Sequence, residues 1–178
     1  GTVVISLAAG VRLATLESAL PGVAVVRAMP NTPALVDLGI TAISPGTSCT
    51  TEQAAYVEGL LSAVGPVVRV SEDLQDAVTA TSGSGPAYVF LLIEAMVAAA
   101  VDLGLPADIA RDLVRTTVVG AATMAAQPTA DVGVLRQQVT SPGGTTAAAL
   151  AVFEAEGFPR IVGAAMTAAR DRGRELGA

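Results

Sequence analysis

The fold is decided between residues 2 and 29, where two apolar runs, Thr2-Val-Val-Ile-Ser-Leu7 and Val23-Ala-Val-Val-Arg-Ala-Met29, flank a helical segment. Both runs are continuous rather than alternating, which is typical of strands buried on both faces of a parallel sheet. Residues 12–20 between them predict a helix that ends at a Pro-Gly pair. This strand–helix–strand order predicts the start of a doubly wound α/β unit.

The alternation of strands and helices continues to residue 70. Residues 39–43 and 66–70 predict two shorter strands. Between them, Thr50 with Gln53 three residues later forms a capping box for a helix that runs to about residue 64. We therefore expect residues 1–70 to form one α/β domain.

A glycine-rich phosphate loop, G-x-G-x-x-G directly after the first strand, is the usual signature of a dinucleotide-binding domain. It is not found in these 178 residues. Gly83-Ser-Gly85 imitates its first half, but Pro86 follows and no apolar strand precedes it. We therefore expect the chain to be the tail of a larger α/β domain together with the region that follows it.

From residue 71 onward the strand signals stop and alanine-rich helical segments follow. The predicted helices span residues 72–81, 86–103, 106–126, 131–138, 141–157 and 159–176. Ser71 is the expected cap of the first, and the second is apolar nearly all round, so it should be buried on most faces. Residues 71–178 are too few to bury so many apolar helices, so we expect an obligate dimer made by them.

Composition excludes several classes of partner. The chain is 52% hydrophobic and carries a net charge of −6, which argues against a nucleic-acid or anionic-membrane partner. The most apolar stretch, residues 87–101, contains Glu94 and is short for a membrane span. Cys49 is the single cysteine, which predicts no internal disulfide and a reducing, cytoplasmic compartment.

Composition also excludes several mechanisms. The chain has no histidine, and all ten basic residues are arginine. Ser-His and Cys-His catalysis therefore cannot operate within it, and neither can Schiff-base chemistry on lysine. A zinc site is not expected from one cysteine without histidine. Carboxylate acid chemistry and catalysis by positioning of a substrate and a cofactor remain.

The segment 139–150 is the strongest candidate for a binding site. Ser141 is placed to cap a helix and Pro142 to occupy its first position. Two glycines then leave the first turn without side-chain bulk, and two threonines add hydroxyls beside free N–H groups. This pattern predicts a small cradle for a carboxylate. A well-capped helix without a ligand is the alternative. The six residues of the cradle are Ser141, Pro142, Gly143, Gly144, Thr145 and Thr146.

Five blocks of this sequence resemble pyrroline-5-carboxylate reductase in order and spacing. They are Ala8-Ala-Gly-Val11, Arg27-Ala-Met-Pro-Asn-Thr-Pro33, Asp76-Ala-Val-Thr79 with Ser82-Gly-Ser-Gly-Pro-Ala-Tyr88, Val139-Thr-Ser-Pro-Gly-Gly-Thr-Thr146, and Gly157-Phe158. The fourth block is highly specific. The resemblance covers the whole chain and about the C-terminal two thirds of such an enzyme. Asp131-Val-Gly133 departs from the His-Pro-Gly common in the family.

The resemblance implies a fold and an activity. The expected fold is the C-terminal part of a Rossmann-type dinucleotide-binding domain followed by an all-helical dimerisation and substrate-binding domain, over residues 1–70 and 71–178. The implied activity is the last step of proline biosynthesis. A hydride passes from NADPH (or NADH) to the C=N bond of 1-pyrroline-5-carboxylate, which gives L-proline. An interlaced homodimer, and often a decamer, is implied too.

The resemblance also implies roles for individual residues. Thr146 is expected to be the catalytic residue, with its hydroxyl bonded to the ring nitrogen of the substrate. The implied substrate-binding residues are Glu72, Ser141, Gly143, Gly144, Thr145 and Thr146. The implied cofactor-binding residues are Ala8, Ala9, Met29, Asn31 and Gln138. No metal is expected.

The sequence alone leaves alternatives open. The chain could be another NADP-linked dehydrogenase with a helical second domain, although hydroxy-acid enzymes of that kind use a lysine. It could also be a helical oligomerisation fragment without chemistry. Among single residues, we expect Arg27 to pair with a carboxylate, Pro86 to be structural, and Glu94 to face solvent or bond across the dimer.

Overall fold

The computed structural model describes residues 2–177, which fall into two compact units. Unit 1 consists of residues 2–87 together with residues 163–177, and unit 2 is Tyr88–Val162. Unit 1 contains the sheet, and unit 2 is helical. The predicted division at residue 70 into a cofactor domain and a substrate domain stays a prediction.

Unit 1 is built on a four-stranded sheet with the order β1-β2-β3-β4. The strands are β1 (Val3–Ser6), β2 (Ala24–Met29), β3 (Thr41–Pro45) and β4 (Val67–Arg69). β1 runs parallel to β2, with Ser6 opposite Arg27, and β4 runs parallel to β3. β3 runs antiparallel to β2. The four predicted strands are all present, and their order follows the chain.

Two features of the sheet differ from the sequence-based expectation. The β2–β3 pair is antiparallel because only residues 30–40 join the two strands, whereas a parallel crossover needs about a dozen residues or more. β1 is half-buried along its whole length rather than buried on both faces. Its place at the edge of the sheet explains this, since it pairs only with β2 in the described residues.

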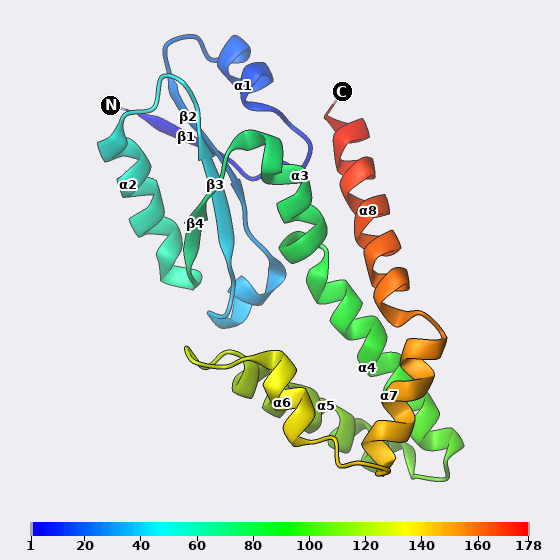
Figure 1. Cartoon of the computed structure of the whole chain (residues 1–178). Coiled ribbons are helices and arrows are strands. Elements are labelled where there is room, and N and C mark those ends of the chain that lie inside the picture. Colours follow the sequence, from blue (N-terminus) through cyan, green and yellow to red (C-terminus); the bar gives the residue numbers. More distant parts are fainter. Residues whose placement is uncertain (1, 178) are drawn as a thin grey trace. The chain divides into compact units, whose positions relative to one another are not determined.

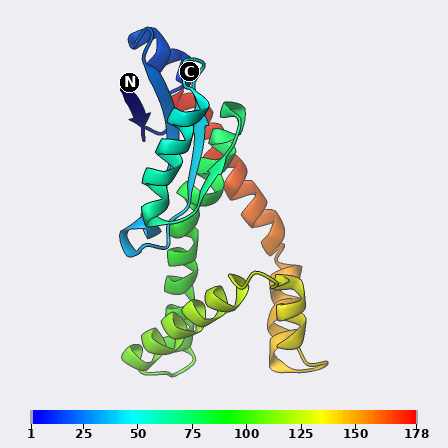
Figure 2. The same cartoon turned by 90° about the vertical axis from the view of Figure 1, so that its left-hand side faces the viewer.

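Helices cover both sides of this sheet. Figures 1 and 2 show α2 (Thr51–Leu61) and α3 (Gln75–Val78) on opposite sides of it. The core consists of Val26, Ala28, Ile43 and Val57, all 2% exposed or less. The helical elements between β1 and β4 are α1 (Leu13–Ala19), η1 (Thr32–Val36), α2 (Thr51–Leu61) and η2 (Ser62–Val64). The capping box of α2 is confirmed, with both of its reciprocal hydrogen bonds formed.

The segment predicted as one helix over residues 72–81 is instead composed of three short elements. They are the 3-10 helix η3 (Glu72–Leu74), α3 (Gln75–Val78) and the π-helical turn η4 (Thr79–Gly83). Hydroxyls explain the irregular turn, because Thr81 and Ser82 donate to the carbonyls four residues earlier. The Ser84 N–H then reaches the Thr79 carbonyl, five residues back. Ser71 occupies the N-cap position of η3 without a capping hydrogen bond, so its predicted cap is wrong.

The remaining helices lie close to their predicted ranges. They are α4 (Gly85–Asp102), α5 (Ala107–Ala125), α6 (Val132–Gln138), α7 (Thr145–Ala155) and α8 (Phe158–Leu176). Asp131 caps α6 by accepting from the N–H groups of Gly133 and Val134. Pro86 lies in the first turn of α4, in agreement with its expected structural role.

The helices of unit 2 leave most of their apolar side chains exposed. Within the described part of this unit, only Ala110 and Val114 are buried. α4 contains no buried residue, so the prediction that it is buried on most faces is wrong for the single chain. The described residues of unit 2 leave one of its faces uncovered, where Phe90 and Leu91 are 58% and 66% exposed. By length and composition alone, the helical stretch Glu72–Asp102 could also cross a membrane.

Candidate functional site

Residues 141–144 form a tight turn directly before α7. The Gly144 N–H donates to the Ser141 carbonyl at 3.0 Å. Pro142 stands at the second position of this turn and Gly143, with φ +66°, at the third, which is the pattern of a type II turn. The predicted roles of Ser141 as cap and Pro142 as first helical residue are therefore wrong. A positive φ cannot continue into a right-handed helix, so α7 starts only after Gly144.

The turn leaves the N-terminus of α7 open. Gly144 is the N-cap residue, and in the described part of the chain no side chain caps this helix. The first N–H groups of the helix, from Thr145 onward, therefore lack an intrahelical acceptor and point out of its N-terminus. Thr146 is partly buried, and Thr145 is exposed. Backbone donors and the helix dipole at this end suit a carboxylate.

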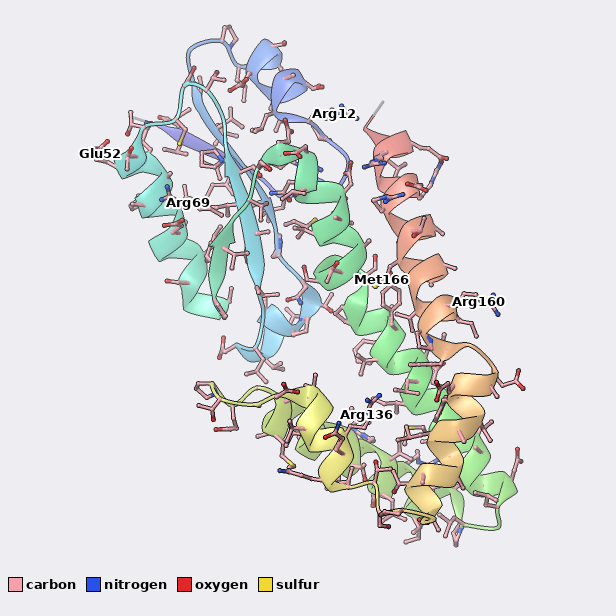
Figure 3. All side chains as sticks on the ribbon, in the orientation of Figure 1. Arg12, Glu52, Arg69, Arg136, Arg160 and Met166 are labelled. Carbon is pink, nitrogen blue, oxygen red and sulfur yellow. The ribbon has the colours of Figure 1, made fainter. Side chains whose placement is uncertain are left out.

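A larger hollow lies along α7 within unit 2. It has a volume of about 840 Å³ and extends between α4, α6, α7 and the start of α8. Its walls include Leu92, Leu150 and the ring pair Phe153 and Phe158, whose centroids are 5.3 Å apart. Arg136, labelled in Figure 3, also lines it. Because the lining is mainly apolar, this hollow suits apolar contacts. The turn before α7 offers the denser set of polar donors.

Gln138, a predicted cofactor contact, ends α6 and is exposed. It lines a separate hollow of about 420 Å³ together with Thr129 and Asp131. Gln138 therefore belongs to unit 2, as do the residues of the turn. The other predicted cofactor contacts belong to unit 1.

Four predicted cofactor-binding residues lie at or just after the carboxyl ends of β1 and β2. Because these strands are parallel, Ala8 and Ala9 lie at the same edge of the sheet as Met29 and Asn31. Ala8 and Ala9 are exposed and small. The Asn31 side-chain oxygen accepts from the Ile40 N–H at 3.0 Å, which holds the loop after β2. Small exposed side chains at this edge suit the close approach of a flat ring, so these residues fit the nicotinamide end of a dinucleotide.

Glu72, predicted to bind substrate, lies in a charged cluster of unit 1. Its Oε1 accepts from the Leu13 N–H at 2.5 Å and from Arg27 Nη1 at 3.3 Å. Arg27 Nη2 lies 3.5 Å from Asp76 Oδ1. Arg27 is only 4% exposed, so the expectation that it pairs with a carboxylate is confirmed. Arg12, which Figure 3 labels before α1, helps to line a pocket of about 320 Å³ here.

Sequence reasoning did not identify the partners in this cluster. A buried arginine inside an apolar strand signals that a carboxylate is near. However, Glu72 lies 45 residues away from Arg27, and nothing in the local spacing selects it over Asp73. The N–H of Leu13 carries no sequence signal at all.

Outside these sites, the described residues offer few side chains suited to catalysis or metal binding. Burial raises the pKa of the Cys49 thiol, which Arg69 partly offsets, so this cysteine is a poor nucleophile at neutral pH. Glu94 is exposed. Among residues 2–177, no three metal-binding side chains lie close enough together to hold an ion.

The helical region matches a known family. The model for pyrroline-5-carboxylate reductase dimerisation matches residues 72–176, more than half of the chain. The chain belongs to the pyrroline-5-carboxylate reductase family. The resemblance found in the five sequence blocks is thereby confirmed, and with it the order of an α/β part followed by a helical part.

Individual members of the pyrroline-5-carboxylate reductase family agree closely with this chain. The enzyme of Synechocystis is 47% identical over 174 residues, which are 98% of this chain and 65% of the relative. The structure from Coxiella burnetii has a TM-score of 0.93 and 44% identity, covering 99% of this chain and 66% of that one. The Plasmodium falciparum reductase, solved with NADP bound, has a TM-score of 0.92 and 31% identity, covering 99% of this chain and 72% of its own. The chain thus spans about 65% of the length of the curated relatives it matches.

Proposed function

We propose that this protein reduces 1-pyrroline-5-carboxylate to L-proline with NADPH (or NADH) as hydride donor, the last step of proline biosynthesis. The observation that carries this proposal is the uncapped start of α7 behind the Ser141–Gly144 turn, in a chain of this family. The substrate has one carboxylate and one C=N bond. Its reduction requires a carboxylate clamp and an oriented ring, and it requires neither histidine nor lysine.

The turn supplies the clamp in this proposal. The N–H groups of Thr145 and Thr146 donate to the substrate carboxylate, while Gly143 and Gly144 let it approach the backbone. The Gly144 N–H already donates to Ser141, so it is not among the donors. Ser141 shapes the turn through its carbonyl.

Thr146 carries the second task, which is to orient the reacting bond. Its hydroxyl forms a hydrogen bond with the ring nitrogen and so holds the C=N bond at a fixed angle. The hydride forms a new C–H bond at the imine carbon, and the π electrons of the C=N bond move to nitrogen. The protonated imine thereby becomes the secondary amine of proline. Thr146 orients the nitrogen throughout and transfers no proton of its own.

The cofactor is proposed to approach the carboxyl edge of β1 and β2. Ala8 and Ala9 form a flat support, and beside it Met29 ends β2 and Asn31 lies on the loop that follows. Gln138 is proposed as a further polar contact. When bound, NADPH (or NADH) supplies the hydride. The Plasmodium falciparum reductase was solved with NADP bound, which supports this class of cofactor.

The helical region is proposed to form a homodimer, and a decamer is the proposed higher assembly. Its support is the match to a dimerisation model and the exposed apolar side chains of α4. We attribute the apolar composition of residues 72–102 to a subunit interface and not to a membrane. A cytoplasmic location without nucleic-acid partners completes the proposal, in keeping with a net charge of −6.

The role of the Thr146 hydroxyl is tested by comparing Thr146→Ala with Thr146→Ser in the natural gene product. Loss of one hydrogen bond to a charged group predicts a fall of about 10-fold in kcat/KM for the imine in the alanine variant. The serine variant keeps the hydroxyl and should retain most of the activity. Equal kinetics for the wild type and both variants would remove Thr146 from the mechanism.

A further inference from the structure

The loop between β1 and α1, residues 7–12, is held by two groups that lie far from it in sequence. On one side, the N–H of Leu13 at the loop's end donates to Glu72 Oε1 at 2.5 Å. On the other, Gly10 is buried, and a Cβ added to it would come within 3.0 Å of the Leu176 Cβ. Ala8 and Ala9 lie between the end of β1 and Gly10 and remain exposed. The second half of the loop, from Gly10 to Leu13, is therefore fixed, and the two alanines face outward between it and β1.

The first anchor is connected to the core of the sheet through Arg27. Glu72 Oε1 accepts from both the Leu13 N–H and Arg27 Nη1. Arg27 is nearly fully buried in β2 and has a second carboxylate, Asp76, 3.5 Å away. Charged hydrogen bonds of this kind are stronger than neutral ones, above all where water is excluded. Arg27 thus fixes the Glu72 carboxylate, and that carboxylate fixes the start of α1.

We propose that Glu72 and Arg27 are positioning residues for the cofactor: together they hold the Ala8–Ala9 backbone in place at the carboxyl edge of β1. This inference rests on the proposed function, because it assumes that a nicotinamide ring lies against that edge. It assigns Glu72 a task different from the substrate contact that the family resemblance implies. Its Oε1 already accepts from two donors of the protein itself.

The decisive variant is Glu72→Gln, which keeps the size of the side chain but removes its charge. We expect the Kd for NADPH, measured by nicotinamide fluorescence without substrate, to rise about 10-fold, because the loop loses a charged anchor. At saturating NADPH, we expect kcat and the KM for the imine to stay within about twofold of the wild type. Amide exchange of residues 8–13 in the cofactor-free protein should become faster.

Two further variants complete the test. Asp73→Asn changes the neighbouring carboxylate, which lines the same pocket but accepts no described hydrogen bond, and should leave the Kd unchanged. Arg27→Lys keeps the positive charge but loses the two guanidinium nitrogens that contact Glu72 and Asp76. Its Kd for NADPH should therefore lie between the values of the wild type and of Glu72→Gln.

The two proposals fail in different ways. A wild-type protein that binds no NADPH contradicts the proposed function itself. If the wild type binds NADPH, the positioning role is overturned by a Glu72→Gln variant that has the wild-type Kd for NADPH. It is also overturned if amide exchange at residues 8–13 is the same in the variant and the wild type. A rise confined to the KM for the imine also overturns it, and makes Glu72 a substrate ligand.

Discussion

Gly143 is the residue on which the shape of the candidate clamp depends most. Its φ of +66° lies in the left-handed region, where an L-residue with a Cβ costs roughly 1–2 kcal/mol. Open space surrounds the position, so the added methyl of Gly143→Ala would meet no neighbouring atom. We therefore expect this variant to raise the KM for the imine several-fold through backbone strain alone, as steady-state kinetics would show. Gly120→Ala, in open space within α5, should leave KM unchanged.

A charged pair on the surface of unit 1 gives a prediction about pH. The hydrogen bond from Arg69 lowers the pKa of Glu58 below its ordinary value of 4.5; Figure 3 labels Arg69 beside α2. A carboxyl whose folded-state pKa is lowered stabilises the fold above its unfolded pKa. This contribution disappears as the pH falls through the folded pKa.

Glu58→Gln should therefore lower the Tm slightly at pH 7 and leave it unchanged well below pH 4.5. The effect should be small, because the Arg69 side chain is exposed to solvent and the Glu58 side chain is partly exposed. Thermal unfolding between about pH 7 and about pH 3 measures it. The same change at Glu156, for which the described residues provide no ion pair, is the control. A constant Tm difference at every pH would contradict the role of the pair.

At the scale of elements, α2 depends on its capping box. Thr50 accepts from the Gln53 N–H, and Gln53 accepts in return from the Thr50 N–H. Thr50→Ala should lower the free energy of unfolding by about 1 kcal/mol, because the first turn of α2 loses a side-chain acceptor. Urea unfolding measures this change. Thr51→Ala, one residue later and outside the box, should cost clearly less, and equal losses would contradict the capping role.

Elements with strong local signals could be predicted from the sequence. The apolar run of β2 and the capping box of α2 both depend on neighbouring residues, so spacing alone identifies them. The start of α7 was misplaced because Ser-Pro is common both before a helix and in a turn. The positive φ of Gly143 decides between the two, and the sequence does not encode it unambiguously.

Features that depend on distant residues could not be predicted in the same way. The Leu13–Glu72 contact joins residues 59 positions apart, so no local spacing predicts it. The cradle residues 141–146 could be named because they are contiguous. The partners of Arg27 could not, since they come from another part of the chain.

At the scale of the whole molecule, the exposed apolar face of α4 predicts association. Leu91 is 66% exposed on this helix, inside the region that matches the dimerisation model. Leu91→Arg places a charge in the proposed interface and should shift the protein towards the mass of a single chain in light scattering. Leu35→Arg is the control, because Leu35 is 88% exposed but lies outside the matched region. A wild type with the mass of one chain would contradict the proposed dimer.

The most direct measurement is an assay of the natural gene product that identifies what its reaction forms. NADPH oxidation should be followed by absorbance and L-proline by amino-acid analysis, with 1-pyrroline-5-carboxylate as substrate. We predict that one L-proline forms for each NADPH consumed. NADPH binding without proline formation, or turnover of a hydroxy acid with no reduction of the imine, would contradict the proposed function.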